Sequence, residues 1–346
     1  MKMTPTHTLS MLALVGLTAC AALTIFIPAQ AKSPSYHLIN KMTVGGDGGW
    51  DYVYLDSGTR TLYVTRGTHV MIINVDTHKV IGDIPDLNGI HGVAIDPWSG
   101  LGFISNGRGN SVVMFDIKTL AKKKEIPVGT GPDAIIYDPQ TKRVYSFNGR
   151  DKSFTAIDGN NGNVLGTFTL PGRPEFPASD GNGHIYDNIE DMSEVVSIAA
   201  TSNTIDKTWP IAPGEGPSGL AYDGNHNRVY SVCDNKLLTV LDPTTGKVVT
   251  TLPIGNGPDA CSFDPGINML YSPNGEDGTM TVYQVTAPDT YKLVTTFNTM
   301  PGARTMTVDL KTHHLWTVSA VPDPNAPTGR RRAYLPGSFV VLEYGK

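Results

Sequence analysis

Residues 131–158, GPDAIIYDPQTKRVYSFNGRDKSFTAID, contain the pattern that decides the fold. A first alternating strand follows Gly-Pro-Asp and ends at a proline turn, a second strand surrounds Tyr145, and a third ends at Asp158. The same order of features returns in residues 216–242 and 257–284. The chain therefore repeats a unit of short strands joined by tight turns, which is typical of all-β proteins.

Two markers extend the repeat over most of the chain. An aromatic residue at the centre of each second strand and a residue that opens each first strand both recur every 40 to 45 residues. The aromatic residues are Tyr63, Phe103, Tyr145, Tyr186, Tyr230, Tyr271 and Trp316. The opening residues are Asp51, His91, Asp133, Glu175, Ser218, Asp259 and Arg304. Both markers predict an all-β fold, a seven-bladed β-propeller with four-stranded antiparallel blades.

The two ends of the repeat array complement each other. The seventh unit stops after its third strand, residues 338–344, and lacks a fourth strand. Residues 36–45 precede the first unit and resemble a fourth strand. We therefore expect the N-terminal strand to close the last blade, so that residues 32–346 form one domain without an open sheet edge.

Composition and charge agree with a turn-rich globular protein. The chain has 346 residues, of which 37 are glycine and 25 are proline, and a formal net charge of −5. The slight negative charge argues against general electrostatic attraction to nucleic acid or to an anionic membrane.

The N-terminal 31 residues indicate export. An apolar run over residues 9–27 leads to Pro28 and the small pair Ala29 and Ala31, a pattern that favours a signal peptide cleaved after Ala31 and a periplasmic or secreted protein. A lipid anchor at Cys20, which would attach the protein to a membrane, and an uncleaved anchor helix are the alternatives. Of the two remaining cysteines, Cys233 and Cys261, we expect separate buried thiols in preference to a disulfide.

The repeats resemble the YVTN-repeat β-propellers, the YncE-like group of exported bacterial proteins. Residues 63–66, Tyr-Val-Thr-Arg, are the nearest copy of the name-giving motif, with Arg66 in place of its asparagine. Residues 145–148 and 271–274 keep that asparagine. The resemblance implies a seven-bladed propeller with ligands at a channel mouth, and it implies no settled reaction.

Antiparallel order places the starts of the first strands and the ends of the second strands on one rim, called the top rim below. We expect a polar and acidic ligand site there, at the mouth of the central channel. The predicted ligand-binding residues are Trp50, Asp51, Arg66, His91, Asn106, Asp133, Asn148, Glu175, Asn188, Asp259, Asn274 and Arg304. Turn and cap roles for the aspartates and asparagines are the structural alternative.

A divalent cation is a further expectation for this rim. His91, Asp133 and Glu175 open consecutive blades, and carboxylate oxygens suit Ca²⁺ or Mg²⁺. A zinc site is disfavoured, because most other histidines precede second strands on the opposite rim and no H-E-x-x-H motif occurs.

The function favoured by these patterns is binding. We expect a monomeric module whose mouth receives a small polar ligand or a loop of a partner protein, since the sequence contains no G-x-S-x-G motif and no dinucleotide-binding fingerprint. One alternative is a divalent-metal-dependent lyase or lactone hydrolase that uses the same residues. The other is single-stranded nucleic-acid binding through Trp50, Arg66, Arg108, Arg150, Arg304 and the basic loop 330–332.

Overall fold

The computed structural model describes residues 1–3, 35–46, 49–325 and 334–346. Apart from residues 1–3, the predicted signal peptide lies outside the described residues, as do the alternative anchor at Cys20 and the basic loop 330–332. Every strand belongs to the compact unit Ser35–Lys346, and of the other unit, Met1–Pro34, only the first three residues are described. Among the described residues, the search for a helix long and apolar enough to span a bilayer finds none.

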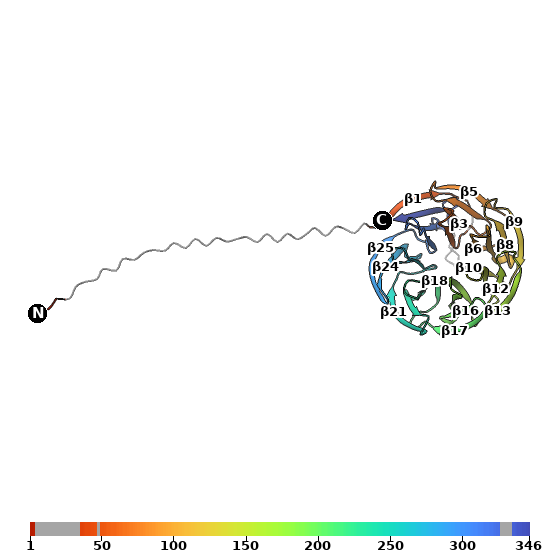
Figure 1. The fold of residues 1–346 in the computed structure, drawn as a ribbon. Helices are drawn as coiled ribbons and strands as arrows, with labels where there is room; N and C mark the ends of the chain where they lie inside the picture. The colour runs from red at the N-terminus through yellow and green to blue at the C-terminus, as the bar shows by residue number, and fades with distance from the viewer. Residues whose placement is uncertain (4–34, 47–48, 326–333) are drawn as a thin grey trace. The chain divides into compact units, whose positions relative to one another are not determined.

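The strands form seven four-stranded antiparallel sheets arranged as blades around a ring (Figure 1). Blade 1 comprises β2 (Val53–Asp56), β3 (Thr61–Thr65), β4 (Val70–Asn74) and β5 (Lys79–Ile84). Blade 2 comprises β6 (Ile90–Asp96), β7 (Leu101–Asn106), β8 (Ser111–Asp116) and β9 (Lys122–Pro127). Blade 3 comprises β10 (Pro132–Asp138), β11 (Arg143–Asn148), β12 (Ser153–Asp158) and β13 (Val164–Thr169).

Blade 4 comprises β14 (Pro174–Ser179), β15 (His184–Ile189), β16 (Glu194–Ala199) and β17 (Thr204–Pro210). Blade 5 comprises β18 (Pro217–Asp223), β19 (Arg228–Cys233), β20 (Leu237–Asp242) and β21 (Lys247–Pro253). Blade 6 comprises β22 (Ser262–Asp264), β23 (Met269–Asn274), β24 (Thr279–Ala287) and β25 (Thr290–Asn298). Single turns of 3-10 helix, η1 (Gly107–Gly109) and η2 (Glu190–Met192), join the second and third strands of blades 2 and 4.

Blade 7 confirms the predicted closure. Its strands β26 (Met306–Val308), β27 (Leu315–Ser319) and β28 (Val340–Gly345) are completed by β1 (His37–Thr43), which is the outer strand. β1 pairs antiparallel with β28, from His37 opposite Gly345 to Thr43 opposite Val340. Strands from both ends of the repeat array therefore share one sheet, and Figure 1 shows them side by side. The prediction of an all-β, seven-bladed propeller is confirmed.

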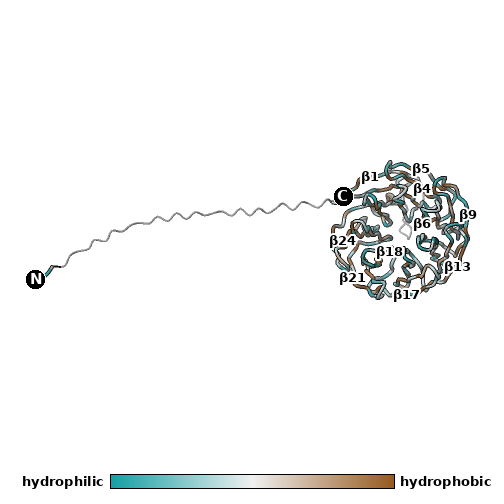
Figure 2. Tube along the Cα trace, viewed as in Figure 1, coloured by the Kyte–Doolittle hydropathy of each residue, from teal (hydrophilic) through white to brown (hydrophobic). Residues whose placement is uncertain are grey.

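The hydrophobic core lies between the blades. The repeat aromatics are buried and face the next blade: Tyr145, for example, packs with Ile185 of blade 4, and Tyr230 with Leu270 of blade 6. Outer strands alternate exposed and half-buried residues, and in Figure 2 hydrophilic and hydrophobic stretches alternate around the ring. Because both faces of each middle strand are buried against neighbouring blades, a single repeat cannot form a stable core without its neighbours.

The two cysteines in the described part of the chain are free and buried, as expected from their positions in neighbouring blades. Burial raises the pKa of the Cys233 thiol to about 12 and also raises the pKa of Cys261. Both thiols are therefore protonated at neutral pH, which makes Cys233 a poor nucleophile.

Candidate functional site

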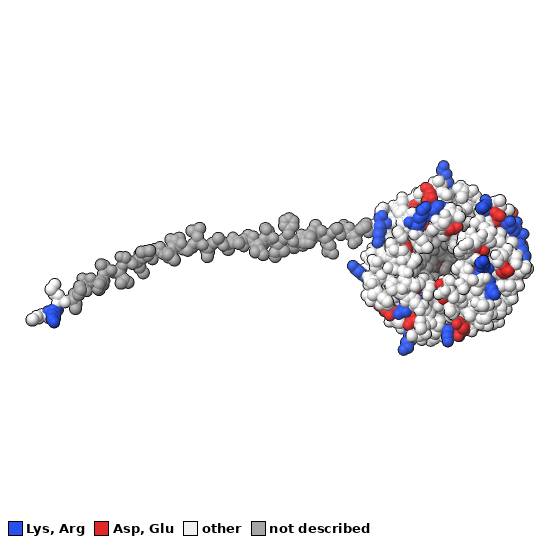
Figure 3. Space-filling view, viewed as in Figure 1, with Lys and Arg blue, Asp and Glu red and all other residues white. Residues whose placement is uncertain are grey.

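The top rim contains a cavity of about 1000 Å³ at the point where the first strands begin. The space-filling view shows a hollow at the centre of the ring with acidic and basic side chains around it (Figure 3). Seven of the predicted ligand-binding residues line the cavity: Trp50, Asp51, His91, Asp133, Glu175, Asp259 and Arg304. They come from blades 1, 2, 3, 4, 6 and 7, so closure of the ring is what gathers them.

Glycines at the blade entrances shape this wall. Gly131 has a φ of +67°, a left-handed conformation that glycine adopts without steric cost. A Cβ atom at this position would lie 2.9 Å from Cγ of Arg150, so the glycine also leaves room for the arginine side chain. Gly89 has a φ of +64° and accommodates Arg108 in the same way. In blades 2 and 3 the glycine at the blade entrance thus leaves room for an arginine from the turn above it.

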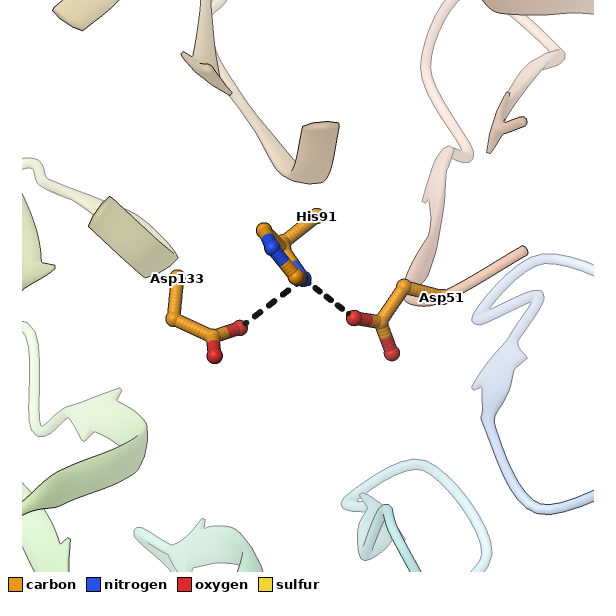
Figure 4. Close-up of side chains that lie close together, drawn as sticks. All are labelled: Asp51, His91 and Asp133. Carbon is orange, nitrogen blue, oxygen red and sulfur yellow. Dashed lines mark hydrogen bonds and ion pairs between the residues drawn. The ribbon is translucent and has the colours of Figure 1, made fainter. Parts of the chain in front are cut away.

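His91 lies between two carboxylates (Figure 4). Its Nδ1 is 2.6 Å from Oδ2 of Asp51 and 3.4 Å from Oδ1 of Asp133. Burial disfavours the charged imidazole, but the hydrogen bond to Asp51 and the negative charges of Asp133 and Asp51 outweigh it and raise the pKa of His91 to about 9. At neutral pH the imidazole is therefore a cation that holds blades 1 to 3 together at the mouth.

Arg304 makes the corresponding connection on the other side of blade 1. Its Nε donates to Oδ2 of Asp259 at 2.7 Å, and its Nη2 lies 3.0 Å from the carbonyl oxygen of Trp50 and 3.4 Å from Oδ1 of Asp51. Burial opposes the charge, but Asp259 and Asp51 more than compensate and raise the pKa of Arg304. Asp51 is thus shared by the two cations.

Two carboxyl groups in the cavity are poorly compensated. Burial raises the pKa of Asp133 to about 7, although the His91 cation acts in the opposite direction. Burial and the neighbouring carboxylates Asp133 and Asp259 raise the pKa of Glu175 well above its usual range. Among the described residues, Glu175 has no hydrogen bond or ion pair through its side chain. A neutral Glu175 has one hydroxyl donor and acceptor capacity to offer a ligand.

An aromatic contact is formed by the residues that follow two of these groups in the sequence. Tyr52 and Phe176 directly follow Asp51 and Glu175, and their ring centroids are 4.9 Å apart in an edge-to-face arrangement. Blades 1 and 4 are not neighbours, so this contact crosses the central channel. Tyr52 is buried. The aromatic pair therefore spans the channel directly after two residues of the cavity wall, and the cavity itself has a size suited to a small ligand.

The mouth carries both signs of charge, whereas the sequence indicated an acidic one. Arg108, Arg150, Arg173, Glu276 and Tyr334 also line the cavity but were not among the predicted ligand-binding residues. Arg108 and Arg150 occupy the turns between second and third strands, and the sequence places them on the correct rim without showing which way they point. Arg173 forms an ion pair with Glu190, and Tyr334 packs 4.5 Å from Trp50 between ring centroids.

The remaining five predicted residues are not part of the cavity wall. Asn106, Asn148 and Asn274 each donate an Nδ2 hydrogen bond of 3.0 Å to a hydroxyl five residues later, at Ser111, Ser153 and Thr279. Asn188 donates to the carbonyl oxygen of Ser218 at 2.7 Å and so joins blades 4 and 5.

Arg66 is buried, and its guanidinium lies 3.6 Å from the centre of the Phe339 ring. The four asparagines thus have the turn and contact roles stated above as the structural alternative, whereas Arg66 packs on an aromatic ring.

The possible metal ligands overlap with the predicted set. Among the described residues, Asp51, His91 and Asp133 offer ligand atoms within 4.8 Å of one another. This group shares His91 and Asp133 with the predicted trio and contains Asp51 but not Glu175, and a bound cation stays a prediction. Two carboxylates and an imidazole on a cavity wall suit a divalent cation with open coordination positions.

Comparison with known proteins identifies the fold. No family model matches the chain, and no curated protein matches it. Among solved structures, a chain of Kuenenia stuttgartiensis hydrazine synthase has a TM-score of 0.70 and 18% sequence identity, covering 84% of this chain and 95% of that one. At this identity the likeness concerns the fold alone, and the resemblance to YVTN-repeat propellers stays a prediction. The chain is a seven-bladed β-propeller, an architecture that serves as a general interaction scaffold.

Proposed function

We propose that the chain is an exported binding module that takes up a small polar ligand in the cavity at its top rim. The observation that carries the proposal is the convergence of Asp51, His91, Asp133, Glu175, Asp259 and Arg304 from six blades on one pocket of about 1000 Å³. The N-terminal apolar run and its small-residue site support a periplasmic or secreted location. The YVTN-like motifs are in keeping with that setting.

Small-ligand binding follows from the shape and polarity of the pocket. Its volume of about 1000 Å³ has room for a small ligand, and imidazolium, guanidinium and carboxyl groups on its wall offer both donors and acceptors. A flexible loop of a partner protein could enter the same mouth, and a ligand screen with a protein-capture arm separates the two occupants.

Thermal-shift screening of the full-length chain against a library of metabolites tests the proposal, because a ligand that binds the native state raises its melting temperature. The mouth variant Asp51→Asn/Asp133→Asn/Glu175→Gln should lose the shifts seen with the unmodified chain. The control Asp83→Asn/Asp206→Asn neutralises exposed carboxylates on the outer strands β5 and β17 and should retain them. Hits that shift the mouth variant as much as the control place the site elsewhere and contradict the proposal.

A second candidate is a divalent-metal-dependent lyase or lactone hydrolase, favoured by the group of Asp51, His91 and Asp133. A bound cation there would polarise a carbonyl oxygen of a substrate in the pocket. Metal analysis of the purified protein by mass spectrometry tests this candidate. One cation per chain that is lost in His91→Gln supports it, and equal metal content in both proteins rejects it.

A further inference from the structure

Arg108 and Arg150 occupy equivalent turns on adjacent blades. Arg108 belongs to η1 of blade 2, and Arg150 to the turn between β11 and β12 of blade 3. Each packs over the left-handed glycine of its own blade entrance: a Cβ atom at Gly89 would lie 2.7 Å from Cγ of Arg108, and one at Gly131 would lie 2.9 Å from Cγ of Arg150. The stems of both side chains are thereby fixed against the pocket wall.

The charged ends of these two arginines are unusual in this protein. Neither guanidinium has a hydrogen bond or an ion pair within the described residues. The other arginines of the described part of the chain contact carboxylates, carbonyl groups or an aromatic ring, and these are Arg60, Arg66, Arg143, Arg173, Arg228 and Arg304. Two exposed guanidinium groups therefore face one pocket without a partner.

The same turn position carries acids elsewhere on the rim. Asp234 of blade 5 packs over Gly216, and Glu276 of blade 6 packs over Gly257. The rim is therefore polarised, with cationic side chains above blades 2 and 3 and anionic side chains above blades 5 and 6. This separation orients a ligand that carries a negative group at one end.

The groups below the arginines do not neutralise them. The Asp51 carboxylate is shared by His91 and Arg304, and Oδ2 of Asp259 lies 2.7 Å from Nε of Arg304. Glu175 lies in the same pocket without a side-chain partner, and burial raises its pKa well above the usual range. A neutral carboxyl group in the same pocket can donate a hydrogen bond to an anion.

We propose that Arg108 and Arg150 bind an oxyanion group of the ligand, a carboxylate or a phosphate. Guanidinium groups form paired, charge-assisted hydrogen bonds with either oxyanion, and the fixed stems reduce the conformational entropy lost on binding. The inference rests on the proposed function, since it assigns a chemical class to the ligand of the same pocket.

Calorimetric titration of the full-length chain at low ionic strength tests the inference with three polyol probes that differ in charge. Glycerol 3-phosphate carries a phosphate, D-gluconate carries a carboxylate, and glycerol has no charge. We expect at least one anion to bind and glycerol to give no heat of binding. The anion that binds more tightly shows whether the site prefers a phosphate or a carboxylate. Failure of both anions to bind overturns the inference.

Variants with matched charge changes locate the anion. Arg108→Gln/Arg150→Gln should weaken the bound anion about 10- to 100-fold, since each lost charge-assisted hydrogen bond costs affinity. Lys207→Gln/Lys292→Gln removes the same charge from the exposed outer strands β17 and β25 and should leave affinity unchanged. If both double variants weaken anion binding equally, the loss comes from the change in net charge, and the assignment of the anion to Arg108 and Arg150 is overturned.

A conservative pair of substitutions guards against a merely structural effect. Arg108→Lys/Arg150→Lys keeps both charges but loses the planar donor pair, so its affinity should lie between those of the unmodified and the Gln variants. If instead the ligands found in the thermal-shift screen are neutral or cationic and lose their shifts in the mouth variant, the proposed function stands and the oxyanion inference fails.

Discussion

At the rim opposite the mouth, where the second strands begin, buried carboxylates join neighbouring blades through hydrogen bonds to basic side chains. Asp309 of blade 7 accepts from Arg60 of blade 1 at 2.7 Å, and Asp264 of blade 6 lies 2.8 Å from Nδ1 of His313 in blade 7. At the top rim, Glu175, Arg108 and Arg150 line a pocket without side-chain partners among the described residues. In the described part of the chain, acidic and basic side chains are therefore paired at one rim and include unpaired members at the other.

The difference teaches how to separate structural from functional charge in a repeat protein. A buried carboxylate that receives several hydrogen bonds has its charge compensated by the fold, and its removal harms stability. A charged group that faces a pocket without a partner adds little to the fold and is available to a ligand. The following predictions test this separation, beginning with the largest effect.

Breaking the ion pair between Asp309 and Arg60, at the rim opposite the mouth, should lower the free energy of unfolding the most. The side chains of Asp309 and Arg60 are 1% and 11% exposed, so Asp309→Ala leaves a buried cation with reduced compensation. We expect the free energy of unfolding to fall by about 3–5 kcal/mol in urea denaturation at pH 7. The control Asp76→Ala removes the other, 54% exposed partner of Arg60 and should cost less than about 1 kcal/mol. Equal losses would contradict the comparison.

Ionisation of Asp133 at the mouth should lower the stability of the folded state as pH rises, which is opposite to the effect of Asp309. Because burial raises the pKa of Asp133 to about 7, its ionisation destabilises the folded state as pH rises from about 4 towards 8. Asp133→Asn should therefore gain about 3 kcal/mol over the unmodified chain at pH 8 and almost nothing at pH 4. Urea denaturation across this range measures the gain.

Asp309 provides the internal reference for that pH series. Burial opposes its ionisation, but hydrogen bonds from Thr312 and Arg60 outweigh burial and lower its pKa. Its contribution to stability is present above the ordinary aspartate pKa and is lost as pH falls through the lowered value. A penalty for Asp309→Ala that grows with acidification would be the wrong sign for this account.

His91 should make the stability of the mouth fall at alkaline pH. Its raised pKa of about 9 means that its contribution is complete below about pH 6.5 and is lost as pH rises through 9. Because the side chain is 34% exposed, we expect this contribution to be about 1–2 kcal/mol. His91→Gln should flatten the stability profile between pH 6.5 and 9, and an unchanged slope there would remove His91 as its cause.

The turn asparagines should affect folding alone. Asn148 is buried and donates to Ser153 and Thr155 at 3.0 and 3.1 Å. Asn148→Ala should lower the free energy of unfolding by about 1–2 kcal/mol and leave ligand affinity unchanged. If Asn148→Ala lowers the free energy of ligand binding more than the free energy of unfolding, Asn148 belongs to the binding site and this prediction is wrong.

The smallest expected change in stability is at the arginines of the pocket rim. Arg150→Gln removes an exposed group without a partner, so the free energy of unfolding should change by less than about 0.5 kcal/mol. The same variant should weaken anion binding, and this split between stability and affinity distinguishes the top rim from Asp309.

The sequence was sufficient to predict the seven-bladed ring and several of the residues at the mouth. Seven blades followed from the spacing of the repeats, and the closing strand β1 followed from the missing fourth strand of the last unit. Asp51, His91 and Asp133 could be assigned to one rim, since antiparallel order determines the ends of strands.

The direction of individual side chains could not be read in this way. Asn148 and Asp133 lie at the same rim, yet the first turns into the hairpin and the second into the cavity. The difference depends on local hydroxyl partners and on glycine conformations at the blade entrances. The sequence pattern does not encode which turn arginines remain unpaired, because that depends on carboxylates contributed by distant blades.

A crystal structure of the full-length chain bound to the tightest ligand from the thermal-shift screen tests the central claim most directly. The account predicts that the ligand lies in the top-rim pocket, within hydrogen-bonding distance of Glu175 or His91. A ligand bound at the opposite rim or on the outer strands, with the pocket side chains unchanged, would contradict it.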